Sequence, residues 1–180
     1  MIKIRIAVLM LLLSVFVCGC GYTTRANIAK DSKNIYVEQF KNKIDLTSEQ
    51  NEYRKLRTYY PLLEANITNE VIDEFLSDGN YKITREDDAE VILTGELLDY
   101  QRDALRYDDD DDVDEYRLNI TVSLSLYNTE ENTLEWKEDR LTGDTTYFTT
   151  GTLAKSEKTA LDEAIDDLAK RIVERVVDDW

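Results

Sequence analysis

"EYRLNITVSLSLY", residues 115–127, decides the fold of this chain, because its side chains alternate strictly between apolar and mainly polar. The apolar set is Tyr116, Leu118, Ile120, Val122, Leu124 and Leu126. The polar set is Arg117, Asn119, Thr121, Ser123, Ser125 and Tyr127. Successive side chains of a strand point to opposite faces of a sheet, so one face is predicted to lie on a core and the other in water. Val122→Asp is then expected to cost several kcal/mol, and Thr121→Asp about 0.5 kcal/mol or less.

Four further strands are predicted around this stretch. Residues 34–40 form the first, with Phe40 on the face opposite to Ile35 and Val37. Two more precede residues 115–127: the short segment 81–84, and 89–101, which is interrupted at Gly95. The last strand covers residues 133–148 and has a bend at Gly143.

Two helices complete the pattern. The first helix is expected to start at Pro61, because the N–H that a proline lacks would be unpaired in the first turn of any helix. Gly79 is expected to cap the C-terminal end of this helix. Its apolar residues recur every fourth position: Leu63, Ile67, Val71 and Phe75. The second helix is predicted from Leu153 to the C-terminus. Its apolar stripe is Leu161, Ala164, Leu168, Ile172, Val176 and Trp180.

These elements predict a single α+β domain over residues 34–180, with the order β-α-β-β-β-β-α. Two helices are expected to pack on one face of a mostly antiparallel, four- to five-stranded sheet, which makes a two-layer sandwich. The other sheet face is then left polar.

The N-terminus carries the pattern of a bacterial lipoprotein signal peptide. Lys3 and Arg5 precede the apolar run Ile6–Val17, which is shorter than the ~20 residues of a transmembrane helix. Val17-Cys18-Gly19-Cys20 then has small residues before Cys20, as a lipobox requires. An ordinary signal peptide or a redox pair is the alternative, but two cysteines one residue apart make a tight disulfide ring. Residues 1–19 are predicted to be removed, and Cys20 to become the lipid anchor.

Residues 20–33 are polar and without pattern, and are predicted to form a tether. Loss of Lys3 and Arg5 takes the formal net charge from −16 to −18. This charge repels nucleic acid and anionic lipid, so the acyl chains are expected to attach the protein to its membrane. Gly21 stands where an inner-membrane retention signal would place aspartate, which favours the outer membrane.

Sites for catalysis are scarce in this sequence. There is no histidine, glycine-rich phosphate loop or zinc-ligand spacing, so neither a cofactor nor a metal is predicted, and no enzyme activity. The acids Glu86–Asp88 are read as a chance cluster in an acidic chain. Asp108, Asp110 and Asp112 have the spacing of a calcium loop, but Val113 replaces its glycine and Asn119 its bidentate glutamate. A solvated hairpin tip is therefore expected.

Several segments together resemble the LptE family of lipopolysaccharide-assembly lipoproteins. They are "GCGY" at Cys20, "YYPLLEANITNEVIDEF", "AEVILTGELLDYQRDALRYD", "DEYRLNITVSLSLYN", "LEWKEDRLTGDTTYF" and the terminal "RVVDDW". The similarity extends from Cys20 to Trp180, and it depends on the order and spacing of the segments more than on any one of them.

The resemblance implies a protein without catalytic activity at the periplasmic face of the outer membrane, held there by its N-terminal acyl chains. Its implied partners are the LptD β-barrel, which it plugs and helps to assemble, and lipopolysaccharide. The candidate contacts to lipopolysaccharide phosphates are the arginines that flank the hairpin tip, Arg102, Arg106 and Arg117. All three are expected to be exposed. The alternative is another α+β outer-membrane lipoprotein that acts as an envelope adaptor or activates a peptidoglycan synthase.

Overall fold

The computed structural model describes residues 32–44 and 60–178. The chain divides into two units, Met1–Lys30 and Asp31–Trp180, and all described residues belong to the second. Its elements are β1 (Asn34–Val37), β2 (Lys41–Asn42), α2 (Leu63–Asp78), β3 (Lys82–Ile83), the 3-10 helix η4 (Glu86–Asp88), β4 (Val91–Tyr107), β5 (Val113–Asn128), β6 (Thr133–Phe148) and α3 (Glu157–Asp178). The predicted signal peptide, the lipidation site Cys20 and Trp180 lie outside the described residues.

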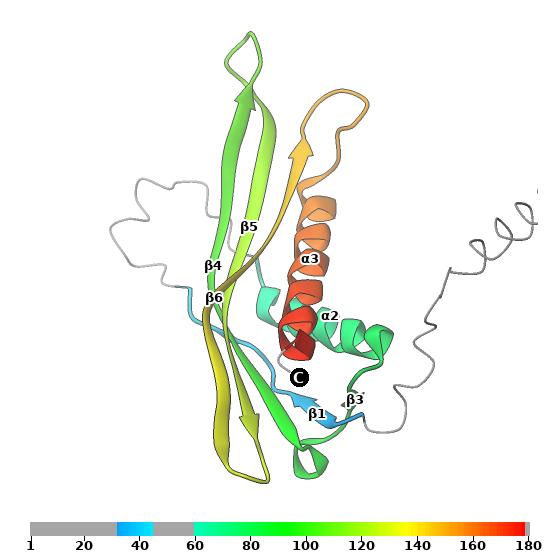
Figure 1. The fold of residues 1–180 in the computed structure, drawn as a ribbon. Coiled ribbons are helices and arrows are strands. Elements are labelled where there is room, and N and C mark those ends of the chain that lie inside the picture. Colours follow the sequence, from blue (N-terminus) through cyan, green and yellow to red (C-terminus); the bar gives the residue numbers. More distant parts are fainter. Residues whose placement is uncertain (1–31, 45–59, 179–180) are drawn as a thin grey trace, which may run out of the picture. The chain divides into compact units, whose positions relative to one another are not determined.

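The strands form one sheet in the order β3-β1-β4-β5-β6, and β2 also pairs with β4. β4, β5 and β6 are a long antiparallel meander, whereas β1 is parallel to β3 and β4, and β2 is parallel to β4. Figure 1 shows both helices on the same side of this sheet. The predicted α+β two-layer arrangement is thus confirmed, with parallel strands added at one edge.

The alternation in β5 has the predicted consequence. Leu118, Ile120, Val122, Leu124 and Leu126 are all buried in the core. They share it with Leu63, Ile67, Val71 and Phe75 of α2 and with Leu161, Ala164, Leu168, Ile172 and Val176 of α3. Burying an apolar side chain of this size stabilises a fold by roughly 1.5–3 kcal/mol, so the core between sheet and helices holds the domain together.

Helix α3 is shorter than predicted at its start. It begins at Glu157 rather than Leu153, because the side-chain oxygen of Ser156 accepts a hydrogen bond from the backbone N–H of Thr159 at 3.1 Å and so caps the helix. The last residue of α3 is Asp178. The first helix, α2, likewise starts two residues after Pro61. Gly79 caps its end as predicted, and its N–H donates to the carbonyl of Phe75 at 3.0 Å.

Gly143 allows α3 to approach the sheet. It pairs in register with Ile120, whereas the two register shifts of β6 fall between Leu134 and Trp136 and between Glu138 and Leu141, so no register shift accompanies the bend predicted at Gly143. A Cβ at this position would lie 2.5 Å from the Cβ, 2.6 Å from the Cα and 2.7 Å from the N atom of Leu168. Only glycine leaves room for the backbone of α3 here.

Phe40 is buried in the same core as Ile35 and Val37, so its predicted assignment to the opposite face is wrong. Lys41 comes four positions after Val37, whereas in β4 its partner Glu96 comes only three positions after Leu93, the partner of Val37. This extra residue reverses the alternation, as a β-bulge does. The displaced N–H of Phe40 donates to the hydroxyl of Thr68 in α2 at 3.0 Å, which keeps it paired in a buried place.

Gly95 does not interrupt β4, contrary to the prediction. The strand continues through it and pairs Gly95 with Leu124 of β5. A methyl group at Gly95 would overlap the ring of Phe40. The glycine is there because the bulge between β1 and β2 places that ring directly on β4.

Candidate interaction surfaces

The sheet face turned away from the helices is the first candidate surface, and we call it the open face. It carries Thr94 and Glu96 of β4, Asn119, Thr121, Ser123 and Ser125 of β5, and Lys137 and Thr142 of β6. Asn119, Ser123 and Ser125 are half-buried. Thr121, in contrast, is only 5% exposed, and its hydroxyl lies 3.0 Å from that of Thr142. The expectation that Thr121 is solvated is therefore wrong, because the neighbouring strand covers it.

A groove of about 420 Å³ lies on the open face. Its lining includes two carboxylates and two ammonium groups, from Glu38, Glu96, Lys41 and Lys137. The other residues that line the groove are Thr94, Gly95, Ser123, Leu124, Ser125 and Tyr127. Donors and acceptors are thus mixed without a dominant charge, in a chain that is strongly acidic as a whole. Such a surface can hydrogen-bond to a polar partner of either sign.

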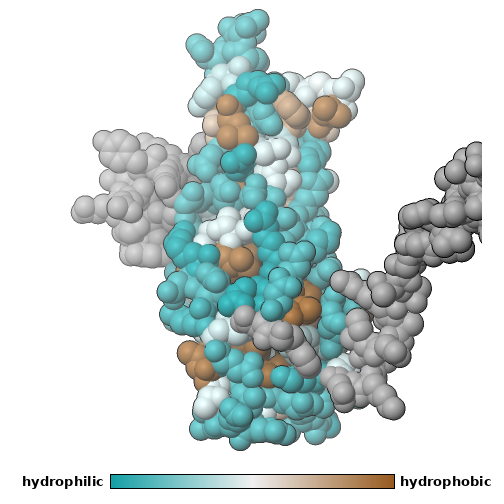
Figure 2. Space-filling view, in the orientation of Figure 1, coloured by the Kyte–Doolittle hydropathy of each residue, from teal (hydrophilic) through white to brown (hydrophobic). Residues whose placement is uncertain are grey.

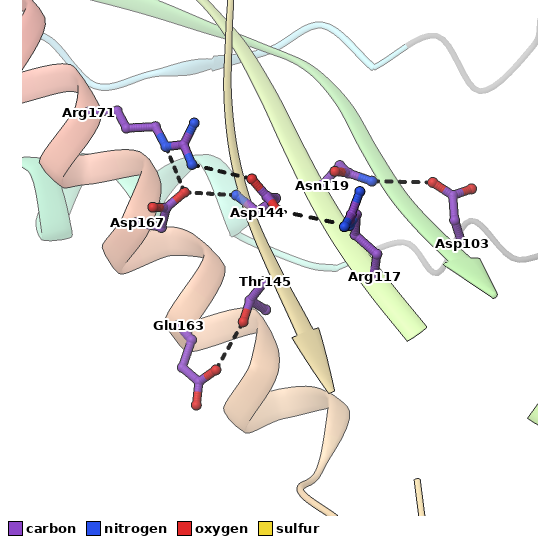
Figure 3. A network of polar contacts seen from close by, with 8 residues as sticks. All are labelled: Asp103, Arg117, Asn119, Asp144, Thr145, Glu163, Asp167 and Arg171. Carbon is purple, nitrogen blue, oxygen red and sulfur yellow. Dashed lines mark hydrogen bonds and ion pairs between the residues drawn. The ribbon is translucent and has the colours of Figure 1, made fainter. Parts of the chain in front are cut away.

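Towards the β4–β5 hairpin, a network of charged groups joins the open face to α3 (Figure 3). Asp144 of β6 accepts from Arg171 of α3 at 3.3 Å, and its other carboxylate oxygen lies 4.0 Å from Arg117 of β5. The backbone N–H of Asp144 donates to Asp167 of α3 at 2.9 Å. Asn119 donates to Asp103 of β4 at 3.2 Å beside this network. Arg117 is thus oriented but 48% exposed, and can still reach a ligand.

Arg102 is in a different environment, on the helix side of the sheet. It forms an ion pair with Glu157 in the first turn of α3 and lies 4.6 Å from the ring centroid of Tyr116. Its side chain is only 18% exposed. Burial acts to lower the pKa of Arg102, but Glu157 and Tyr147 outweigh it, so the pKa is raised overall. The expectation that all three candidate arginines are exposed fails at Arg102.

Glu157 also organises the tyrosines around it. Tyr100 donates its hydroxyl hydrogen to Glu157 at 3.3 Å, and Tyr147 stacks on Tyr116 with ring centroids 5.6 Å apart. Burial, followed by the charge of Glu157, raises the pKa of both Tyr100 and Tyr147. This cluster fixes the base of the β4–β5 hairpin to the start of α3.

The third candidate arginine, Arg106, lies further along the hairpin. Its guanidinium is 3.5 Å from Glu115 and 5.7 Å from the ring centroid of Phe148. Arg106 and Arg117 are exposed, while Arg102 faces the helices, so the structure does not bring the three into one cluster. Their contact with lipopolysaccharide stays a prediction.

The outer end of the β4–β5 hairpin is the second candidate surface. Between Tyr107 and Val113 the chain makes the acidic turn Asp108–Asp112, which is exposed as predicted. The large apolar side chains Leu105 and Tyr107 are exposed beside it, as is Leu153 in the loop between β6 and α3. Sequence reasoning missed all three. For Leu105 and Tyr107 the signal was readable, because they come just before a run of five aspartates, whereas nothing near Leu153 marks it.

Glu86–Asp88 form the exposed η4, where Asp88 pairs with Arg85 at 3.3 Å. In residues 32–44 and 60–178, no group of three histidine, cysteine or acidic side chains is arranged to hold a metal ion. Within the same ranges, no helix is both long enough and apolar enough to cross a membrane.

Three solved structures share this fold at low sequence identity. A protein from Xanthomonas campestris is 10% identical, with a TM-score of 0.55, and the match covers 82% of each chain. A hypothetical protein from Chlamydia trachomatis is 12% identical, with a TM-score of 0.53, covering 81% of this chain and 96% of that one. An uncharacterised lipoprotein B from Nitrosomonas europaea is 13% identical, with a TM-score of 0.51, covering 81% and 83%.

The sequence itself matches a family model. Residues 33–178 match the model described as LptE, lipopolysaccharide-assembly. Among curated proteins, none matches the chain.

Proposed function

The chain belongs to the LptE lipopolysaccharide-assembly family, and on this premise we propose that it plugs the LptD barrel and assists the assembly of that barrel. We propose further that it does so without catalysis, as a lipoprotein anchored through Cys20 at the periplasmic face of the outer membrane. There it would help to deliver lipopolysaccharide to the cell surface.

The observation that carries the plug proposal is the two-sided sheet. One face holds the apolar core against α2 and α3, and the open face presents hydroxyl, amide and charged groups along β5. The interior of a large outer-membrane barrel is polar. A domain that enters it needs a surface able to pair with polar groups there, because unpaired buried polar groups are costly. The mixed groove over Ser123 and Ser125 supplies such groups.

Co-purification and depletion test this proposal. The LptD barrel of the same cell is expected to co-purify with the protein. Depletion of the protein is expected to lower the amount of assembled LptD and to admit large hydrophobic antibiotics. If assembled LptD and permeability stay at wild-type levels after depletion, the plug proposal fails. A peptidoglycan synthase that co-purifies in place of the barrel would favour the adaptor alternative.

The anchor is tested by replacing each cysteine. Cys20→Ala is expected to give an unacylated protein that leaves the membrane fraction, whereas Cys18→Ala stays membrane-bound. Intact mass and membrane fractionation measure both. Acyl chains on the Cys20→Ala protein would exclude Cys20 as the lipidation site.

Lipopolysaccharide contact remains part of the proposal for Arg106 and Arg117, but not for Arg102. The exposure of Arg106 and Arg117 supports a direct contact with phosphates. Arg102 is engaged with Glu157, which supports a role in holding the hairpin rather than one in direct contact.

A further inference from the structure

We propose that the outer end of the β4–β5 hairpin is a docking element for a protein surface that carries an apolar pocket bordered by lysine or arginine. The docking element consists of Leu105, Tyr107, the acidic turn Asp108–Asp112 and Leu153. It is separate from the open face. The inference rests on the proposed function only for the choice of LptD as the partner in its test.

Exposed apolar side chains gather at this end of the molecule. Leu105 is 45% exposed, Tyr107 is 59% exposed and Leu153 is 72% exposed. The other large exposed apolar residues in the described ranges are Leu62 and Leu76 near or on α2, and Tyr127 and Leu134 at the opposite end of the sheet. In Figure 2, two hydrophobic patches with hydrophilic atoms between them lie just below the hydrophilic upper end, where Figure 1 shows the hairpin and the loop before α3. A group of such residues, unlike a single one, marks an interaction site.

The docking element is held in shape by its own hydrogen bonds. A carboxylate oxygen of Asp108 accepts from the N–H groups of Asp110 and Asp112, both at 3.0 Å. The loop that carries Leu153 is tied to the start of β5, because the N–H of Thr149 donates to the carbonyl of Asp114 at 2.9 Å. A surface that is already ordered loses little conformational entropy on binding. More of the free energy of its apolar contacts therefore appears as binding affinity.

The charge of the turn selects the class of partner. It holds five consecutive aspartates and no basic residue. Arg106, the nearest cation on the hairpin, is paired with Glu115. An anionic lipid surface would repel this turn, whereas lysine and arginine side chains around an apolar pocket complement it. A protein with such a pocket is therefore the occupant that fits both the exposed apolar groups and the charge.

The first test compares matched variants of the full-length lipoprotein in its barrel complex. Leu105→Ser with Tyr107→Ser and Leu153→Ser is expected to lower the yield of co-purified LptD by about tenfold, in the range of the anchor residues of protein interfaces. Leu76→Ser, a similarly exposed change on α2, is the control and is expected to leave the yield unchanged. Thermal unfolding checks that both variants are folded. Full LptD recovery with the folded triple variant would overturn the inference.

The second comparison isolates charge. Asp109→Asn with Asp110→Asn removes two charges and leaves the Asp108 carboxylate in place. We expect a several-fold loss of LptD recovery at low salt that narrows as salt is added, because screening already weakens the wild-type attraction. Glu86→Gln with Asp87→Asn makes the same charge change on η4 and is expected to have no effect. Equal losses from the two double variants would show that only net charge matters, and would overturn the selective role of the turn.

Photo-crosslinking in cells identifies the occupant directly. A photoreactive phenylalanine analogue in place of Tyr107 is expected to crosslink to LptD, and Asp109→Asn with Asp110→Asn should weaken that crosslink. A product with lipid or lipopolysaccharide, or no product, would overturn the inference even if LptD still co-purifies and the proposed function stands. If LptD does not co-purify with the wild-type protein, the proposed function fails. A charge-dependent crosslink to another protein would then support the docking element only if the crosslinked site is an apolar pocket bordered by lysine or arginine. Any other crosslinked site, or no crosslink, would overturn the docking element too.

Discussion

Thr121 and Val122 are neighbours in β5, and both are almost completely buried, but on opposite faces and for different reasons. Val122 lies in the core shared with the helices. Thr121 lies on the open face, where its hydroxyl pairs with Thr142 of the neighbouring strand at 3.0 Å. The core face is covered by the apolar side chains of α2 and α3. The open face has no such cover, and Thr121 is buried there only by its contact with a polar side chain of the next strand. The two faces should therefore respond differently to the same change.

A charge placed on each face gives the largest contrast. Val122→Asp leaves an unpaired carboxylate in the apolar core and is expected to lower the free energy of unfolding by about 4 kcal/mol or more. Thr121→Asp loses the hydroxyl pair with Thr142 but stays on the face that no helix covers, where a small rearrangement exposes the carboxylate to water, and should cost about 1–3 kcal/mol. Urea titration measures both, and Thr121→Ser, which keeps the hydroxyl, is the control. If Val122→Asp and Thr121→Asp lowered the free energy of unfolding equally, the view that only one face of the sheet is covered would be wrong.

The second prediction concerns glycines on the covered face. Gly143→Ala places its methyl group against the backbone of α3, which cannot move without the helix, and should cost about 2–3 kcal/mol. Gly95→Ala meets the end of a single side chain, that of Phe40, and should cost somewhat less, about 1–2 kcal/mol.

Repacking separates the two cases. Phe40→Leu is expected to recover part of the loss caused by Gly95→Ala, and none of that caused by Gly143→Ala. The difference is measured as a double-mutant cycle in urea. Additive effects of Gly95→Ala and Phe40→Leu would mean that the ring does not determine the need for glycine.

The arginines make a smaller contrast between the faces. Arg102→Gln removes one partner of the largely buried ion pair with Glu157 and should lower the free energy of unfolding by about 1–3 kcal/mol. Arg117→Gln breaks an exposed pair 4.0 Å long with Asp144 and should cost about 0–1 kcal/mol. Thermal unfolding at matched pH ranks the two variants. Should Arg117→Gln prove the more damaging, the assignment of Arg102 as the structural arginine is wrong.

The smallest effect is expected in lipopolysaccharide binding. Arg106→Gln with Arg117→Gln should leave stability nearly unchanged and weaken binding by roughly three- to tenfold, with the difference shrinking as salt is added. Arg85→Gln with Arg140→Gln removes the same charge elsewhere and is the control. Unchanged affinity in the first variant would show that these exposed arginines do not contact lipopolysaccharide.

Regular patterns could be read from the sequence, whereas local departures from them could not. The strict alternation of β5 identified its buried face, and the spacing from Leu63 to Phe75 identified that of α2. Phe40 was misassigned because one extra residue reverses a period of two, and nothing in "NIYVEQF" marks the bulge. Gly95 and Gly143 suggest breaks when read alone. Their reason lies in Phe40 and Leu168, which approach them only in three dimensions.

The candidate site was less predictable for a similar reason. Arg102, Arg106 and Arg117 are close in sequence to the same hairpin, but strand alternation and the register shift after Ala104 distribute them over different environments. Glu157, the partner of Arg102, is 55 residues away. No local pattern connects such residues, so the difference between a structural arginine and an exposed one could be seen only in the fold.

The parallel pairing of β1 also bears on how the domain folds. Asn34 and Glu90, whose hydrogen bond fastens β1 to the start of β4, are 56 residues apart. β4, β5 and β6 are instead joined by short turns, so their contacts close small loops. Because contacts between distant residues slow folding, we expect the meander and α3 to form first and β1 to add last. The amides of β1 should then exchange with solvent hydrogen sooner than those of β5, so the strand that follows the predicted tether in sequence opens before the centre of the sheet does.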